Sequence, residues 1–192
     1  MLTMNTFSRR GLVLTILLVT FQAAAIAAEQ SQSVLDFCVP VLPEQARQVI
    51  ETQYTGWRIL VVSDLNKDDQ EIWSRTHRGQ CPGITSGRFV SSSKADYAVL
   101  LINKQSTPRE TRVIVIRSNA SSAYEAMTIY SNNKVTNYPV IHTSKSGKYH
   151  DFHDRKKFVQ IDSDVLIYEH IESRALAFYY KGGKFVRLVI SD

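Results

Sequence analysis

The chain has 192 residues, of which 23 are Lys or Arg, 18 are Asp or Glu, and 44% are hydrophobic. This composition is typical of one globular domain and excludes fibrous, disordered and multi-span membrane proteins. The formal charge of +5 suggests an anionic partner, but its meaning depends on where the excess lies along the chain.

Residues 1–28 have the layout of an export signal, in which Arg9 and Arg10 precede an apolar run that ends in small residues. The run is short for the roughly 20 apolar residues that span a bilayer, so we expect cleavage near Ala28 and no stable membrane anchor afterwards. An uncleaved anchor is the alternative. The partial match of Ser8–Leu12 to a twin-arginine start leaves both the general secretory and the twin-arginine route open. We therefore expect a periplasmic or secreted protein with a single domain over residues 29–192.

Cys38 and Cys81 both lie in the expected mature chain, where an oxidising compartment favours a disulfide between them. Such a bridge would tie the N-terminal segment to the middle of the domain. The alternative is a nucleophilic thiol at Cys81 with His77, four residues earlier, as its partner.

The first half of the domain shows two helical segments. Apolar residues at helical spacing predict a helix from Pro43 to about Tyr54, and the β-branched run Trp57–Ser63 predicts a strand. The acidic stretch that follows resembles a calcium loop, but its sixth and twelfth positions hold Asp69 and Arg75 instead of Gly and Glu. We therefore expect Asp64 or Asn66 to cap a short helix over residues 67–77.

The rest of the chain reads as a succession of strands. Gly182-Gly183 is a two-residue hairpin turn between the two clearest ones. The pattern predicts an α+β fold, a mostly antiparallel, meander-like sheet with two short N-terminal helices packed against it. The expected strands are residues 86–90, 95–103, 110–117, 124–130, 135–142, 157–161, 164–171, 174–181 and 184–190.

One stretch, residues 87–100, resembles a single degenerate repeat of the FG-GAP or VCBS family. Gly87, Phe89, Asp96 and the apolar strand after Tyr97 match the family's frame. The resemblance implies an extracytoplasmic β scaffold and no activity. Because Asp96 is the only carboxylate left in the loop, whereas calcium takes six to eight oxygen ligands, we expect the turn to persist without tight calcium binding.

The segment 142–157 gathers cationic, histidine and aromatic side chains, and its net charge of +3 equals the excess that remains once Arg9 and Arg10 are removed. A metal site at His150 and His153 with Asp151 or Asp154 is one interpretation, although strand positions three apart face opposite sides. A second is binding of an anionic envelope component or an acidic protein, and a third is a solvated loop. The candidate partner-binding residues are Lys145, Lys148, Tyr149, His150, His153, Arg155, Lys156 and Lys157.

No motif for nucleophilic or metal-dependent catalysis is present. The carboxylate pairs Asp162 and Asp164, or Glu169 and Glu172, are possible acid/base groups, but the first pair is more typical of turn caps. We therefore expect an exported, non-enzymatic protein that binds a macromolecular partner, as inhibitors and immunity factors do, with no cofactor, metal or nucleic acid. A small periplasmic hydrolase with a dispersed active site is the alternative.

Overall fold

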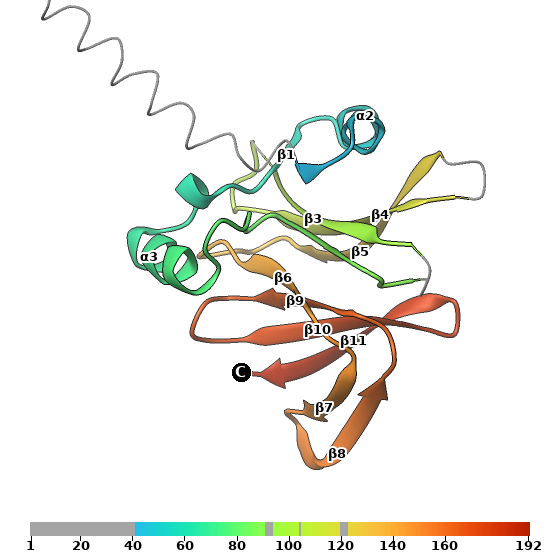
Figure 1. Cartoon of the computed structure of the whole chain (residues 1–192). Coiled ribbons are helices and arrows are strands. Elements are labelled where there is room, and N and C mark those ends of the chain that lie inside the picture. The colour runs from blue at the N-terminus through green and yellow to red at the C-terminus, as the bar shows by residue number, and fades with distance from the viewer. Residues whose placement is uncertain (1–40, 91–93, 104, 120–122) are drawn as a thin grey trace, which may run out of the picture. The chain divides into compact units, whose positions relative to one another are not determined.

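The computed structural model describes residues 41–192 apart from 91–93, 104 and 120–122. The predicted signal and Cys38 lie outside these residues. The α+β class is confirmed: two short helices accompany strands that pair antiparallel throughout the described part (Figure 1). None of the helices described is long and apolar enough to cross a membrane.

The first sheet has the order β1-β3-β4-β5, and β2 pairs with β3 beside β1. The meander β3-β4-β5 forms most of it, and the pairing of β4 with β5 shifts register between Val113 and Ile114. The strands are β1 (Trp57–Ile59), β2 (Ile84–Gly87), β3 (Asp96–Asn103), β4 (Thr111–Ser118) and β5 (Tyr124–Asn132).

The second sheet has the order β11-β10-β9-β6 and contains a second meander, β9-β10-β11. Strands β7 and β8 form a separate two-stranded hairpin. The strands are β6 (Val140–Ser144), β7 (Gly147–Asp151), β8 (Asp154–Ile161), β9 (Val165–Glu169), β10 (Ala175–Lys181) and β11 (Lys184–Ser191).

The two sheets pack face to face, and the main core lies between them. Alternate residues of a strand point to opposite faces, so Leu100 and Ile102 of β3 meet Leu176 and Phe178 of β10 in this core. The intervening residues of the same strands are buried too, because each sheet is covered on its outer side as well. Burial on both faces explains why these strands form continuous apolar runs in the sequence.

Helix α2 (Glu44–Gln53) covers the outer face of the first sheet. Ala46, Ile50 and Tyr54 are buried there, as the helical spacing predicted. The Tyr54 hydroxyl lies 3.2 Å from Thr128 Oγ1 of β5, and the guanidinium of Arg112 lies 4.4 Å from the centre of the Trp57 ring. The helix thus closes one side of the molecule with aromatic and aliphatic contacts.

Helix α3 (Lys67–Thr76) begins where the sequence predicted, since the Asn66 side chain accepts a hydrogen bond from the Asp69 amide. Its Trp73 is almost fully buried in the core between the sheets. Strand β1, however, ends at Ile59 and not at Ser63. Asp64 accepts a hydrogen bond from the Val61 amide and bonds to the Arg58 guanidinium, and a 3-10 turn replaces the end of the strand.

Two other predicted strands are displaced. Strand β2 ends at Gly87, because the chain turns there to bury Phe89 completely, and a Cβ on Gly87 would lie 2.8 Å from that ring. Strand β6 begins after Pro139, which has no amide hydrogen to donate to a ladder. The predicted loop over 142–157 is also wrong in part, because most of it is the β7–β8 hairpin.

Candidate functional site

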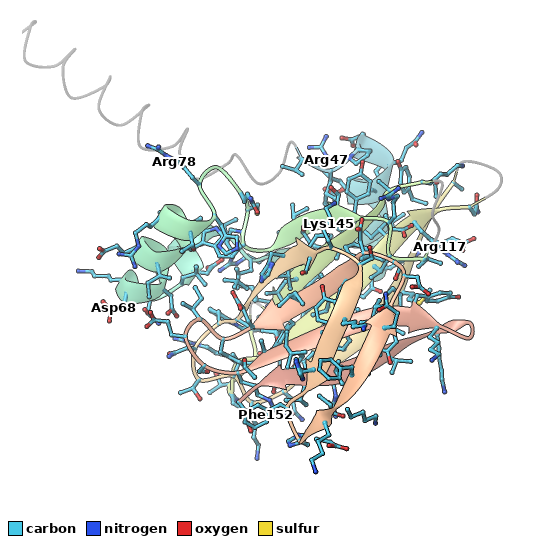
Figure 2. The ribbon with its side chains drawn as sticks, turned by 60° about the horizontal axis from the view of Figure 1, so that its bottom comes forward. Arg47, Asp68, Arg78, Arg117, Lys145 and Phe152 are labelled. Carbon is cyan, nitrogen blue, oxygen red and sulfur yellow. The ribbon has the colours of Figure 1, made fainter. Side chains whose placement is uncertain are left out.

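The β7–β8 hairpin lies on the outer face of the second sheet, where it covers a third apolar cluster. Tyr149 and Val159 face each other in the register and point toward that cluster. The Tyr149 hydroxyl also lies 2.8 Å from Ser144 Oγ. At the turn, the Phe152 amide donates a hydrogen bond to the Val189 carbonyl of β11 at 2.9 Å. Figure 2 shows the hairpin across the front of this sheet, with Lys145 and Phe152 labelled at its two ends.

The opposite, outward face of the hairpin combines positive charge with an exposed aromatic ring. The register places Lys148, His150 and Phe158 on this side. Lys156 lies two residues before Phe158 and is exposed where the ladder shifts register between His150 and Asp151. We call these four residues the hairpin face. Phe158 is 54% exposed, and the His150 ring centre lies 3.9 Å from its ring centre. Among the described residues, no ion pair involves Lys148 or Lys156. The face is therefore equipped to meet a surface with both acidic and apolar groups.

The remaining predicted residues are placed differently. Lys157 Nζ lies 3.7 Å from Asp151 Oδ2, and Lys145 Nζ lies 3.8 Å from Asp164 Oδ1. His153 is exposed at the hairpin turn. Tyr149 contacts the sheet, and the side chain of Arg155 lies outside the described part. The structure thus brings three of the eight predicted residues together on the hairpin face.

Phe158 belongs to this face but was not among the predicted binding residues. It was assigned to a strand over 157–161, where an aromatic residue usually indicates core packing. The alternation in Phe158-Val159-Gln160-Ile161 was the available signal, because Val159 and Ile161 have to share the buried face. Phe158 then points toward solvent.

The metal interpretation of His150 and His153 finds no support in the geometry. His150 packs on Phe158, whereas the His153 ring centre lies 5.7 Å from that of Phe152. Within the described ranges, no group of three or more His, Cys, Asp or Glu side chains could hold a metal ion.

His77 belongs to a different cluster, beside α3. Its ring stacks on Trp73 with centres 4.0 Å apart, and it lies 5.1 Å from the ring of His142. Burial, and next the neighbouring His142, lower the pKa of His77. His142 Nε2 lies 3.6 Å from Glu169 Oε1, and its hydrogen bond lowers the pKa of Glu169. Cys81 is buried and is not a free cysteine, but Cys38 lies outside the described residues, so the disulfide stays a prediction.

Asp96, the carboxylate that matches the FG-GAP or VCBS pattern, has a structural role. Asp96 is 3% exposed, and its Oδ2 accepts a hydrogen bond from the Val90 amide at 2.9 Å. Burial raises the pKa of Asp96, while hydrogen bonds from the Val90 and Phe89 amides act in the opposite direction. This carboxylate holds the turn after β2 in place. Residues 91–93 of the same stretch lie outside the described part.

The two carboxylate pairs are split by the fold. Asp164 is buried and accepts a hydrogen bond from the Arg88 amide, whereas Asp162 is exposed. Glu169 contacts His142, but Glu172 lies in the turn between β9 and β10 with φ of 59°. Neither pair has two carboxylates in equivalent surroundings.

A cavity of about 300 Å³ bears on the hydrolase alternative, because Asp69, Lys134, His170 and Ser173 line it. Burial lowers the pKa of His170, which favours a neutral ring. In the described part, no hydrogen bond joins this ring to the side chain of Asp69 or Ser173, so the cavity holds candidate groups without a nucleophile–base contact.

No family model, curated protein or solved structure matches this chain. The likeness of residues 87–100 to an FG-GAP or VCBS repeat therefore stays a prediction from the sequence.

Proposed function

We propose that this chain is an exported, non-enzymatic protein that uses the hairpin face to bind an acidic surface of a partner protein, as inhibitors and immunity proteins do. One observation carries the proposal. Phe158 is half exposed between Lys148 and Lys156, whose ammonium groups form no ion pair with another described residue. Aromatic residues are enriched in the buried cores of interfaces and charged residues lie mainly at the rim, so Phe158 suits the role of anchor and the two lysines that of its rim.

The charge distribution supports an acidic partner. The segment 142–157 has a net charge of +3, which is the whole excess expected after removal of the signal. Complementary charge of this kind speeds association and selects the partner, while the apolar contact contributes affinity.

The hairpin is also held in place before any partner arrives. Tyr149 and Val159 pack on the sheet, and Phe152 is bonded to β11 through its amide. A face that is already ordered loses little conformational entropy on binding. This favours recognition by a preformed surface.

The test is capture of partners from an envelope extract by the purified protein, comparing two variants with wild type. We expect Phe158→Ser to weaken binding of the captured partner about tenfold or more. Lys148→Ser with Lys156→Ser should weaken it about fivefold at low salt and less at high salt. The matched control is Lys67→Ser with Lys184→Ser, which removes the same charge from exposed sites elsewhere and should retain the partner.

A partner that binds both hairpin variants as tightly as wild type would contradict the proposal. Flotation with vesicles containing phosphatidylglycerol provides the second arm. Charge-dependent binding to those vesicles, without any captured protein, would show that an anionic lipid surface is the ligand and that a protein partner is wrong.

The hydrolase alternative depends on the cavity around His170. If it holds, the purified protein hydrolyses an activated ester such as p-nitrophenyl acetate faster than buffer, and His170→Gln abolishes the increase. Equal rates in wild type and His170→Gln would remove this cavity as the active site.

A further inference from the structure

A second cavity, of about 420 Å³, lies where three segments of the chain meet. The end of β8 and its connection to β9 supply Gln160, Asp162 and Ser163. The segment after β2 supplies Arg88, and the end of β10 supplies Tyr180 and Lys181. This volume falls within the range of about 300–1,000 Å³ that is usual for small-molecule sites.

The wall of this cavity is fixed by a buried carboxylate. Asp164 is 6% exposed, and its Oδ2 accepts a hydrogen bond from the Arg88 amide at 2.9 Å. The Asp164 amide donates in return to the Arg88 carbonyl at 3.3 Å. Arg88 Nε and Lys145 Nζ lie 3.9 and 3.8 Å from the same carboxylate, so its charge is compensated. The backbone of this wall is therefore fixed in advance of any ligand.

The cavity has one buried polar atom without a partner among the described residues, and Asp162 at its rim accepts only a long hydrogen bond, from Gln160 Nε2 at 3.5 Å. Ser163 Oγ is a buried oxygen without a hydrogen bond in the described chain, which is costly for a hydroxyl. Because this oxygen is buried in the free protein, contact with a ligand requires the side chain to adopt another χ1 rotamer. Asp162 and Lys181 are exposed at the rim and form no ion pair with another described residue. The cavity thus offers both hydrogen-bond donors and acceptors.

These features select the class of ligand. Asp164 is already paired with Arg88 and Lys145, which leaves Asp162 and Lys181 as one exposed charge of each sign at the rim. Neither an anion nor a cation therefore meets an excess of unpaired opposite charge there. An uncharged ligand with many hydroxyl groups satisfies both kinds of group, because each hydroxyl donates and accepts. The partly buried ring of Tyr180 adds an apolar surface for C–H groups. We propose that this cavity binds an uncharged saccharide, independently of the hairpin face.

Saturation-transfer NMR on the purified protein tests this proposal with glucose, galactose, mannose, N-acetylglucosamine, maltose and cellobiose as probes. We expect transfer to at least one of them. For that sugar, Ser163→Ala should weaken binding about fivefold and Asp162→Asn about five- to tenfold, since each removes one hydrogen bond or its charge. Ser173→Ala, the same change in the cavity beside His170, is the matched control and should leave the affinity unchanged.

Thermal unfolding of Ser163→Ala separates a ligand contact from a structural one. Removal of an unsatisfied hydroxyl should leave the Tm of the free protein unchanged or higher. A clear fall in Tm would make the hydroxyl structural and overturn its assigned role. Three results would overturn the proposal: transfer to none of the six sugars, equal affinity in wild type and both cavity variants, or transfer only to the added competitors glycine, a zwitterion, and glutamate, an anion.

Discussion

The two C-terminal hairpins are built in opposite ways although both are antiparallel pairs of similar length. In β10–β11, the five residues Ala175–Tyr179 of β10 are all buried, with Leu176 and Phe178 facing the core between the sheets. In β7–β8, only one face is covered, and the other exposes Phe158 between lysines. One hairpin belongs to the second sheet, with β10 inside the sheet and β11 at its edge, whereas the other presents a surface on top of that sheet.

The difference separates stability from recognition. A strand that is buried on both faces loses packing on either side when a residue changes, so β10 tolerates little variation. The outward side chains of β7 and β8 contact mainly solvent and each other. Substitutions there cost little stability, so these positions can carry residues that bind a partner. The inward residues Tyr149, Val159 and Ile161 hold the hairpin in place, together with the hydrogen bond from the Phe152 amide to β11.

Truncation of a phenylalanine in each hairpin should give the largest contrast. Phe178→Ala removes a ring that is 2% exposed and lies 5.4 Å from the ring of Tyr130, and we expect a loss of about 3–5 kcal/mol in the free energy of unfolding. Phe158→Ala should cost about 0.5 kcal/mol or less, because its ring is half exposed. Urea denaturation measures both, and similar losses at the two positions would contradict the proposed division.

The same glycine substitution should have opposite effects in the two hairpins. Gly183 has φ of +84° in the β10–β11 turn, so Gly183→Ala forces a strained backbone and should lower the free energy of unfolding by about 1–2 kcal/mol. Gly147 of β7 has no left-handed φ, and an added Cβ meets no atom within 4 Å. Gly147→Ala should leave stability unchanged or raise it by about 0.5 kcal/mol. If Gly147→Ala lowered the free energy of unfolding as much as Gly183→Ala, the backbone angle and the open space at Gly147 would not explain the effect of the substitution.

The sequence predicted β10–β11 better than β7–β8 for a physical reason. The apolar runs on both sides of Gly182-Gly183 predict two buried strands, and the two glycines predict the turn between them, so the local sequence and the fold agree. Strand β7 contains Lys148, His150 and Asp151, and its pairing depends on the sheet beneath it, which the local sequence does not reveal. The buried face of α2 could likewise be predicted from the helical spacing of Ala46, Ile50 and Tyr54, because local spacing and burial agree there too.

The candidate sites follow the same rule. The charge of residues 142–157 was visible in the sequence, but the ion pair of Lys157 with Asp151, which sets it apart from Lys148 and Lys156, depends on the fold of the hairpin. The cavity wall depends on Asp164 and Arg88, which are 76 positions apart, so no local pattern could bring them together. Long-range contacts of this kind are fixed by topology alone.

A smaller effect should distinguish two partly buried histidines, His77 and His170, from His153, which is exposed on the β7–β8 turn. Burial lowers the pKa of His77 and His170 below the ordinary value of 6.5, so the unfolded chain binds protons more readily than the folded protein. Stability is therefore complete above about pH 6.5 and falls as the solution is acidified below it. The lowered pKa of Glu169 acts in the same direction, at the lower pH where that carboxylate takes up its proton.

The measurement is the free energy of unfolding of wild type, His77→Gln, His170→Gln and His153→Gln between pH 7.5 and 5.5. The first two variants should lose less stability on acidification than wild type does. His153→Gln, an exposed residue, serves as the control and should follow the wild-type curve. Identical curves for all four proteins would show that the buried rings are not responsible for acid sensitivity.

The smallest change in stability should come from the hairpin face itself. Lys148→Ser with Lys156→Ser removes two exposed ammonium groups that form no ion pair with any described residue, so the free energy of unfolding should change by about 0.5 kcal/mol or less. Lys157→Ser is the informative neighbour, because it breaks the contact with Asp151, whose side chain is only 18% exposed, and should cost about 0.2–1 kcal/mol. Urea denaturation of the three proteins checks this order. If the double variant unfolded more easily than Lys157→Ser, its lysines would be structural, and weaker partner capture by that variant could no longer be attributed to the hairpin face.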